Sequence, residues 1–403
     1  MLGLPERAVV FGLARSGRAA AAALERRGVQ VVGVDRTLGN DADERVLDGT
    51  GLLVKSPGVP GEVPLVAAAR GRGIPVWSEV ELGARLLPNP IVGVTGTNGK
   101  TTTAELLGAI FQAAGRGAAV AGNVGTALCA LDGRLPTEDW IVCELSSFQL
   151  EDVHELRPRV AILLNLEPDH LDRHVSLDRY LGAKLRVFRR QGPGDAAIVP
   201  RGFRAVPGQA RRIEFHGADP LPAEPRIPGA HNRENAAAAT AAARAVGIEE
   251  AAIARALTTF PGVEHRLEPV AEVRGVHYVN DSKATNTAAA RRGLAAHEGP
   301  VRLILGGSLK DEPFEPLAAA IGSNVRGVYL IGEAADRLAA ALDARGVAYR
   351  RSGDLAGAVG AAAAAAEPGE TVLLSPACAS YDQFENFERR GEEFRRLVKN
   401  LGG

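Results

Sequence analysis

The stretch Val94-Thr95-Gly96-Thr97-Asn98-Gly99-Lys100-Thr101-Thr102 lies between an apolar run and a helical pattern and decides the fold around it. Residues 91–94 predict a short buried strand, and residues 103–111 predict a helix with one apolar face. A glycine-bearing turn before a helix directs backbone N–H groups toward one point, where the helix N-terminus already favours anions. Lys100 is then placed to reach the terminal phosphates of a nucleotide, and the hydroxyl of Thr101 to bind Mg²⁺.

This turn departs from the strict phosphate-loop pattern at one position. The pattern requires a glycine five residues before Gly99, and Val94 stands there. The alternative is an ordinary glycine-rich turn between a strand and a helix. Strand, turn, Lys-Thr pair and helix follow one another in the required order, which favours a nucleotide phosphate site at residues 96–102.

The bulk properties indicate a soluble protein of several domains. The chain has 403 residues, of which 46% are hydrophobic and 24% charged, with a formal net charge of −1. This length predicts about three domains. The near-neutral net charge does not indicate binding to nucleic acid or to an anionic membrane. Its three cysteines lack metal-ligand spacing, no leader-like segment opens the sequence, and no apolar run reaches about 18 residues. A reduced, cytoplasmic protein is expected.

Three α/β segments are expected, at residues 1–88, 89–262 and 263–403. The first contains a β-turn-α-β unit with Gly12 and Gly17 in its turn and Asp35 at the end of its second strand. Only part of the dinucleotide fingerprint is present, so a related nucleotide-binding role is favoured over NAD. The other two segments alternate apolar strands with helices, which predicts parallel sheets. Strands are expected at residues 140–144, 160–165, 276–279, 301–306, 328–331 and 371–374.

Polar residues follow several of these strands, at the edge where open α/β sheets bind ligands. Glu144 ends one strand and is suited to hold Mg²⁺ or to begin a helix. His170 is suited to a structural or a ligand role, whereas Lys184 by itself predicts a solvated helix lysine. The cluster at residues 231–235 suits either base binding or a helix cap.

Two further strings, at residues 280–286 and 375–387, are rich in hydrogen-bond donors and follow predicted strands. Such loops indicate recognition of a small polar ligand. Cys378 lies in the second string, but no nearby histidine is available to activate it, so we expect an inert thiol.

Taken together, these motifs resemble the Mur ligase family, over essentially the whole chain and in the family's order. The strings are Thr95-Gly-Thr-Asn-Gly-Lys-Thr-Thr, Glu144-Leu-Ser-Ser-Phe-Gln-Leu, Asp169-His170, His231-Asn232 with Asn235, His265-Arg266, Asn280-Asp-Ser-Lys-Ala-Thr-Asn and Ser375-Pro-Ala-Cys-Ala-Ser-Tyr-Asp-Gln-Phe. The earlier strings are shared with folylpolyglutamate synthases. The last two resemble the branch that adds D-glutamate to UDP-N-acetylmuramoyl-L-alanine.

The resemblance implies an ATP-dependent ligase that proceeds through an acyl phosphate, in the cytoplasmic stage of peptidoglycan synthesis. It implies a Rossmann-like UDP-substrate domain, a central ATPase-type domain with a parallel sheet, and a Rossmann-like C-terminal domain that binds the amino acid. The expected cofactors are ATP, two Mg²⁺ ions and a carbamate on Lys184. The expected partners are the two substrates, without nucleic acid or membrane insertion, and the chain is expected to be a monomer.

The resemblance also assigns residues to these roles. Catalytic roles fall on Lys100, His170 and Lys184. ATP binding falls on Gly96, Thr97, Asn98, Gly99, Lys100, Thr101, Thr102, Asn235, Arg266, Asp281 and Lys283. Metal binding falls on Thr101, Glu144, His170 and Lys184. UDP-substrate binding falls on Ser16, Asp35, Ser56, Asn123 and Ser146, and D-glutamate binding on Thr285, Lys310, Ser380 and Phe387.

The first segment departs most from the family pattern, with Arg15 where an apolar residue is usual and Arg36-Thr37 in reversed order. Three alternatives remain: a sibling ligase adding L-alanine or a diamino acid, a folylpolyglutamate synthase, and a nucleotide-gated regulatory protein. The diamino-acid branch carries Asp-Asn-Pro-Arg, a string that this sequence lacks.

Overall fold

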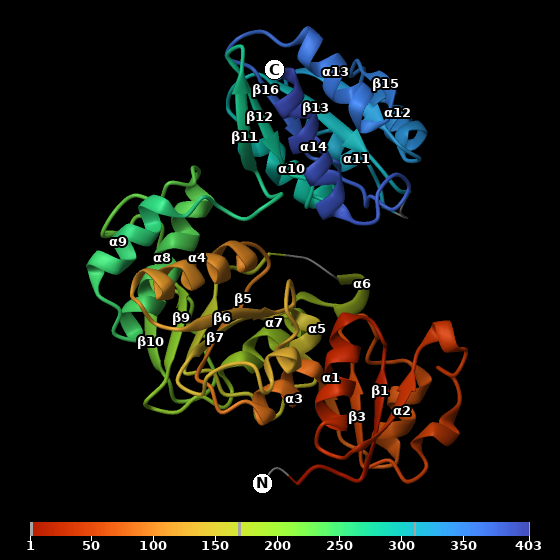
Figure 1. The fold of residues 1–403 in the computed structure, drawn as a ribbon, viewed down its shortest axis with the longest axis vertical. Helices are drawn as coiled ribbons and strands as arrows, with labels where there is room; N and C mark the ends of the chain where they lie inside the picture. The colour runs from red at the N-terminus through yellow and green to blue at the C-terminus, as the bar shows by residue number, and fades with distance from the viewer. Residues whose placement is uncertain (1–2, 168–170, 310–311, 403) are drawn as a thin grey trace. The chain divides into compact units, whose positions relative to one another are not determined.

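A computed structural model describes residues 3–167, 171–309 and 312–402 (Figure 1). The chain forms two compact units, residues 1–260 and 261–403. In the described residues, the first unit contains a four-stranded and a six-stranded sheet, and the second contains one six-stranded sheet. Helices pack on each sheet, so the predicted α/β class is confirmed. None of the described helices is long and apolar enough to cross a membrane.

The four-stranded sheet is wholly parallel. Its strands, in spatial order, are β2 (Gln30–Val34), β1 (Arg7–Phe11), β3 (Leu52–Lys55) and β4 (Val76–Ser78). Its helices are α1 (Arg15–Glu25), α2 (Pro64–Gly71) and α3 (Glu79–Leu86). The predicted turn glycines have a steric reason. Gly12 has a φ of +88°, and a Cβ on Gly17 would lie 1.8 Å from the Gly12 carbonyl oxygen, so only glycine lets α1 start so close to the turn.

The six-stranded sheet of the first unit is also parallel. Its strands, in spatial order, are β10 (Arg211–Phe215), β9 (Ala196–Pro200), β8 (Val160–Leu163), β5 (Ile91–Thr95), β7 (Trp140–Glu144) and β6 (Ala118–Gly122). Its helices are α4 (Lys100–Ala113), α5 (Ser147–Leu150), α6 (Leu171–His174), α7 (Leu177–Leu185), α8 (Ala230–Ala245) and α9 (Glu250–Thr259). The strand predicted at residues 140–144 is confirmed, and α4 begins three residues earlier than predicted.

The sheet of the second unit is parallel except at one edge. Its strands, in spatial order, are β11 (Glu268–Val273), β12 (Val276–Asn280), β16 (Thr371–Leu374), β13 (Val301–Gly306), β14 (Val325–Ile331) and β15 (Arg350–Gly353). Its helices are α10 (Thr287–Ala295), α11 (Glu315–Ala318), α12 (Ala335–Asp343), α13 (Leu355–Ala365) and α14 (Phe387–Leu401).

The segment was expected to be an α/β unit of parallel type, and the antiparallel pairing of the unpredicted strand β11 with β12 is the exception to it. The two strands are joined by Arg274 and Gly275, which both have positive φ, +53° and +76°. A two-residue turn of this kind forms a hairpin, and only antiparallel strands can be connected so tightly.

Candidate active site

The predicted phosphate turn connects β5 to α4 and has the backbone geometry of an anion cradle. Gly96 and Gly99 adopt φ values of +152° and +81°, which side chains other than glycine rarely adopt. A Cβ on Gly99 would lie 2.1 Å from Asn235 Oδ1, so the glycine also allows α8 to approach the turn. No side chain caps the N-terminus of α4. That helix end therefore has the character of an anion site.

The segment after β8 holds this turn in place. The backbone N–H of Asn98 donates to Asn165 Oδ1 at 2.8 Å, and the Asn165 amide donates back to the Asn98 carbonyl at 3.2 Å. Asn98 Nδ2 also donates to Glu167 Oε2 at 2.9 Å. From the sequence, residue 165 was expected at the end of a strand and no role was predicted for it. Its partner Asn98 lies 67 residues away in the chain, so no local pattern indicates the contact.

Two lysines meet at one carbonyl of the turn. Lys100 Nζ donates to the Gly96 carbonyl at 2.9 Å and to the Thr97 carbonyl at 2.8 Å, and Lys184 Nζ donates to the same Gly96 oxygen at 2.8 Å. Lys184 is only 1% exposed, and its ammonium lies 4.4 Å from the centre of the Tyr180 ring. The solvated lysine expected from residue type alone is therefore wrong, because α7 packs directly against the turn.

A buried carboxylate lies one strand away from the turn. Glu144 ends β7, pairs in register with Val94 of β5 and is 3% exposed. Asn123 donates from Nδ2 to Glu144 Oε1 at 3.0 Å. Thr101, in the first turn of α4, is likewise buried. No group of three histidine, cysteine or acidic side chains that could hold a metal gathers in the part of the chain that the structure describes. The predicted ligand His170 lies outside the described residues.

Ser146 has a structural partner of its own. Its hydroxyl accepts from the Gln149 backbone N–H at 3.3 Å, while the Gln149 side chain accepts from the Ser146 backbone N–H at 2.9 Å. This is a capping box at the start of α5. The hydroxyl predicted to contact the UDP-substrate is thus already engaged in stabilising a helix end.

A cavity of about 680 Å³ lies beside the four-stranded sheet and reaches the end of β6. It brings together four of the predicted UDP-substrate residues and two cations; these are Ser16, Asp35, Ser56, Asn123, Arg15 and Arg36. Asp35 accepts from the Leu13 backbone N–H at 2.7 Å and from Thr37, and these hydrogen bonds lower the pKa of its carboxyl group. Arg15 donates to the Asn123 carbonyl at 3.2 Å, so the departure from the family pattern at this position lies within the cavity wall.

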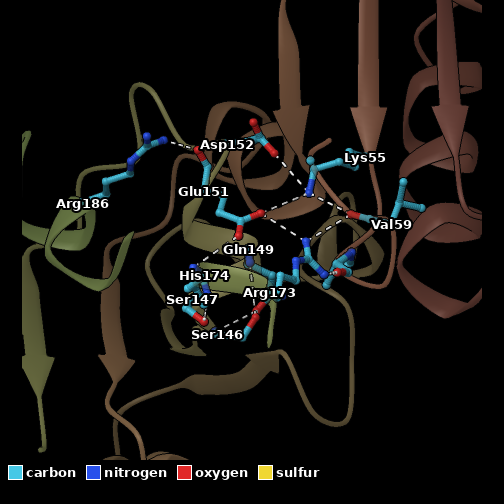
Figure 2. Close-up of polar contacts among 12 residues, drawn as sticks. Lys55, Val59, Ser146, Ser147, Gln149, Glu151, Asp152, Arg173, His174 and Arg186 are labelled. Atoms are coloured by element: carbon cyan, nitrogen blue, oxygen red, sulfur yellow. Dashed lines mark hydrogen bonds and ion pairs between the residues drawn. The ribbon is translucent and has the colours of Figure 1, made fainter. Parts of the chain in front are cut away.

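Charged side chains that are buried or partly buried contact the segment at residues 57–59 (Figure 2). Lys55, at the end of β3, donates to the Val59 carbonyl at 3.1 Å, and Arg173 donates to the carbonyls of Pro57 and Val59 at 2.9 and 3.1 Å. Glu151 Oε2 lies 3.6 Å from Lys55 Nζ and 3.1 Å from the Arg173 guanidinium. Since Pro57 and Val59 line the cavity, this network sets the position of the wall.

The same network extends to the phosphate turn. Glu151 Oε1 lies 3.6 Å from His174 Nδ1, and His174 Nε2 lies 2.9 Å from the Ser147 hydroxyl (Figure 2). The His174 ring lies 5.2 Å from the Tyr180 ring, and the Tyr180 hydroxyl donates to Thr97 Oγ1 at 3.2 Å. None of these links was predicted, because each joins single residues far apart in sequence and leaves no local pattern.

In the second unit, the two donor-rich loops lie side by side, since β12 and β16 pair and the Asp281 N–H donates to the Leu374 carbonyl at 2.8 Å. The Asp281 carboxyl group accepts from the Ser375 hydroxyl at 2.7 Å, and burial raises its pKa to about 6. Lys283 Nζ lies 5.9 Å from the centre of the Phe387 ring.

The remaining assigned residues of this unit are placed as follows. Arg266 precedes β11, Thr285 lies in the loop after β12, and Ser380 is buried in the loop after β16. Lys310 lies outside the described residues.

Comparison with known proteins matches two domain families. The Mur ligase middle domain matches residues 94–215, and the Mur ligase glutamate ligase domain matches residues 265–378. An Acidobacterium capsulatum protein named UDP-N-acetylmuramoylalanine--D-glutamate ligase is 40% identical over 98% of this chain and 96% of its own. A protein of the same name from Anaeromyxobacter dehalogenans is 43% identical over 97% of both chains.

Solved structures show the same fold at low identity. The UDP-N-acetylmuramate-alanine ligase MurC of Thermotoga maritima matches with a TM-score of 0.61 at 17% identity, covering 98% of this chain and 99% of that one. The MurF ligase of the same organism, solved in complex with ADP, matches with a TM-score of 0.60 at 16% identity, covering 90% and 92%.

Proposed function

The chain belongs to the Mur ligase family, and from this premise we propose that it joins D-glutamate to UDP-N-acetylmuramoyl-L-alanine by ATP-dependent amide ligation in peptidoglycan synthesis. The observation that carries the proposal is the identity of 40% and 43% to two relatives of that name, across 98% and 97% of the chain. Identity of this extent over all three sheets favours the D-glutamate ligase over a sibling.

ATP is the nucleotide that we assign to the turn at residues 96–102. The uncapped end of α4 and the glycine backbone fit a phosphate group, and Lys100 adds a positive charge at the same place. When bound, ATP supplies the phosphoryl group that activates the substrate carboxylate as an acyl phosphate, which the amine of D-glutamate then attacks. Lys100 would counter the negative charge that develops on the transferred group.

Oxygen ligands suited to Mg²⁺ lie beside the turn. The Thr101 hydroxyl and the Glu144 carboxylate are the pair that we assign to one ion. A second ion would use His170 and a carbamate on Lys184. Carbamate formation requires a neutral amine, and the buried amine of Lys184 lies against the turn, where a carbamate would be beside the proposed ATP site.

The 680 Å³ cavity is the site that we assign to the UDP-substrate. The side chains of Arg15 and Arg36 provide two positive charges, which suit a diphosphate, and Ser16 and Asn123 provide hydrogen-bonding groups beside them. Asn123 also contacts Glu144, so the cavity adjoins the proposed metal site.

D-glutamate is assigned to Thr285, Ser380 and Phe387 of the second unit, together with Lys310. Hydroxyl and ammonium donors suit a ligand with two carboxylates. The residues Asn235, Arg266, Asp281 and Lys283 are assigned to ATP. We further propose a cytoplasmic, monomeric enzyme that does not bind nucleic acid.

Phosphate release by the purified protein tests this function. The assay contains ATP, Mg²⁺, UDP-N-acetylmuramoyl-L-alanine and one amino acid at a time, with controls that omit each component. Of the amino acids tested, only D-glutamate is expected to support phosphate release. Equal or faster turnover with L-alanine, L-glutamate or a diamino acid would reject this assignment in favour of a sibling ligase. ATP hydrolysis without either acceptor would favour a nucleotide-gated protein.

A further inference from the structure

The second unit has a point in its sheet where neighbouring strands lead to opposite faces. The segment after β13 leads to α11, which packs on one face with α10 and α12, and the segment after β16 leads to α14, which packs on the other face with α13. Because β13 and β16 are neighbours, their following segments diverge there. Open α/β sheets bind ligands at such a crevice.

The backbone at this point is held in unusual conformations. Gly306, the last residue of β13, and Gly307, which follows it, have φ values of +125° and +140°, and Ala377, after β16, has a φ of +62°. A non-glycine residue in the left-handed region is strained, and such strain persists where neighbouring contacts fix the backbone. The two segments are joined by a bridge between Ser308 and Ala379.

One arginine of α14 supplies the contacts that fix these segments. Arg390 is 1% exposed. Its guanidinium donates to the Ser282 hydroxyl and carbonyl at 3.0 and 2.9 Å, and to the carbonyls of Cys378, Ala379 and Gly306 at 3.0, 3.1 and 3.5 Å. These acceptors belong to the last residue of β13 and to the segments after β12 and β16. A single side chain therefore connects three strand ends.

Every one of these acceptors is neutral. Among the described residues, no carboxylate hydrogen-bonds or ion-pairs with Arg390. Asp382 is near enough to favour the charged guanidinium, but its carboxylate accepts from the Ser308 hydroxyl and the Glu333 N–H. Burial lowers the pKa of Arg390 to about 10, which still leaves it charged at neutral pH. The sheet edge thus carries a buried positive charge that the described part of the chain does not pair.

We infer that Arg390 is a positioning and specificity-determining residue for the amino-acid substrate. It holds the backbone immediately before Ser380, and its charge favours a dicarboxylate over an amino acid with one carboxylate. Its link to Phe387 runs through Ser282, whose hydroxyl donates to the Phe387 carbonyl at 2.8 Å. This inference rests on the proposed function, because it takes D-glutamate as the ligand of these loops.

The test compares Arg390→Gln and Arg390→Lys with Arg389→Gln as a matched control. Arg389 is the preceding residue of α14, but its side chain is 63% exposed and pairs with Glu392. Thermal unfolding first identifies the variants that fold. The KM for D-glutamate and the inhibition constant of D-glutamine, which has the same shape and one carboxylate fewer, are then measured for each variant.

Arg390→Gln is expected to raise the KM for D-glutamate by about tenfold or more while changing the inhibition constant of D-glutamine much less. Arg390→Lys keeps the charge but has fewer donors, so it is expected to lower kcat while retaining most of the discrimination. Arg389→Gln should match the wild type. If Arg390→Gln weakens both amino acids equally, or neither, the inference is wrong even though the proposed function stands.

If Arg390→Gln does not fold, the variant Ser282→Ala tests the inference instead. Ser282→Ala removes the acceptor of Arg390 Nε and the donor to Phe387, and is expected to raise the KM for D-glutamate; an unchanged KM would overturn the inference. A wild-type protein that does not use D-glutamate at all would instead reject the proposed function.

Discussion

Glu79 makes the stability of the first unit depend on pH. It is the first residue of α3 and is fully buried, and its carboxylate accepts from the Cys129 backbone N–H at 2.6 Å. The second carboxylate oxygen has no hydrogen-bond partner among the residues that the structure describes. Burial raises the pKa of Glu79 from 4.5 to about 7. A charged carboxylate in this place lacks the hydration that water would provide.

The sign and size of the effect follow from this shift. Because the folded-state pKa is raised, the stability contributed by the protonated group is fully present below pH 4.5 and is lost as the pH rises through about 7. Each pKa unit corresponds to about 1.4 kcal/mol, so the loss in unfolding free energy approaches about 3 kcal/mol. Glu79→Gln imitates the protonated form and should remove this loss.

The assay is urea unfolding of wild type, Glu79→Gln and Glu25→Gln at several values between pH 5 and 8. Glu25 is an exposed residue at the end of α1 and serves as the matched control. Both tryptophans, Trp77 and Trp140, lie in the first unit, so their fluorescence reports on its unfolding. The stability of Glu79→Gln relative to wild type should increase by about 2–3 kcal/mol toward pH 8. Parallel pH profiles for wild type and Glu79→Gln would refute the reasoning.

Three further predictions concern the proposed nucleotide site. Lys100→Ala should lower kcat by at least about a hundredfold without loss of fold. Lys399→Ala, at an exposed lysine, is the control and should leave kcat unchanged. A folded Lys100→Ala with more than about a tenth of the wild-type rate would exclude the turn as the ATP site. Lys184→Ala should be nearly inactive and partly rescued by acetate or formate, and full activity without rescue would contradict the carbamate. Gly99→Ala places a Cβ against Asn235 Oδ1, so calorimetry should show weaker ATP binding; unchanged affinity would mean that the turn adapts.

Strands with apolar runs were predictable from the sequence, and two edge strands, β6 and β15, were not. The run at residues 301–306 predicted β13 correctly because it is mostly apolar and is bounded by Pro300 and Gly307, residues typical of turns. β6 has an alanine- and glycine-rich sequence and β15 an arginine-rich, exposed one, so neither carries the alternation or apolar run of a strand. The direction of β11 depends on a hairpin turn, and hydrophobic patterning does not encode strand direction.

The candidate site was predictable where its residues are local in sequence. The phosphate turn could be predicted because a glycine turn and its helix are contiguous. Lys184 could be assigned only through the family resemblance, because its burial results from the packing of α7 on a turn 88 residues away. Arg173 and Arg390 were missed for the same reason. Their acceptors are mostly backbone carbonyls, which every residue type provides.

The contacts between the two sheets of the first unit determine how that unit opens. Asp152 pairs with Lys55 and Arg70, and Glu81 of α3 accepts from the backbone N–H groups of residues 154–156. A fragment starting at residue 89 would leave those N–H groups and the Asp152 carboxylate without their partners. The amides of β3 and β7 should therefore exchange with deuterium through one shared opening event, with similar protection and a common response to denaturant. In hydrogen exchange, the two sheets would behave as a single foldon despite their separate strand pairings.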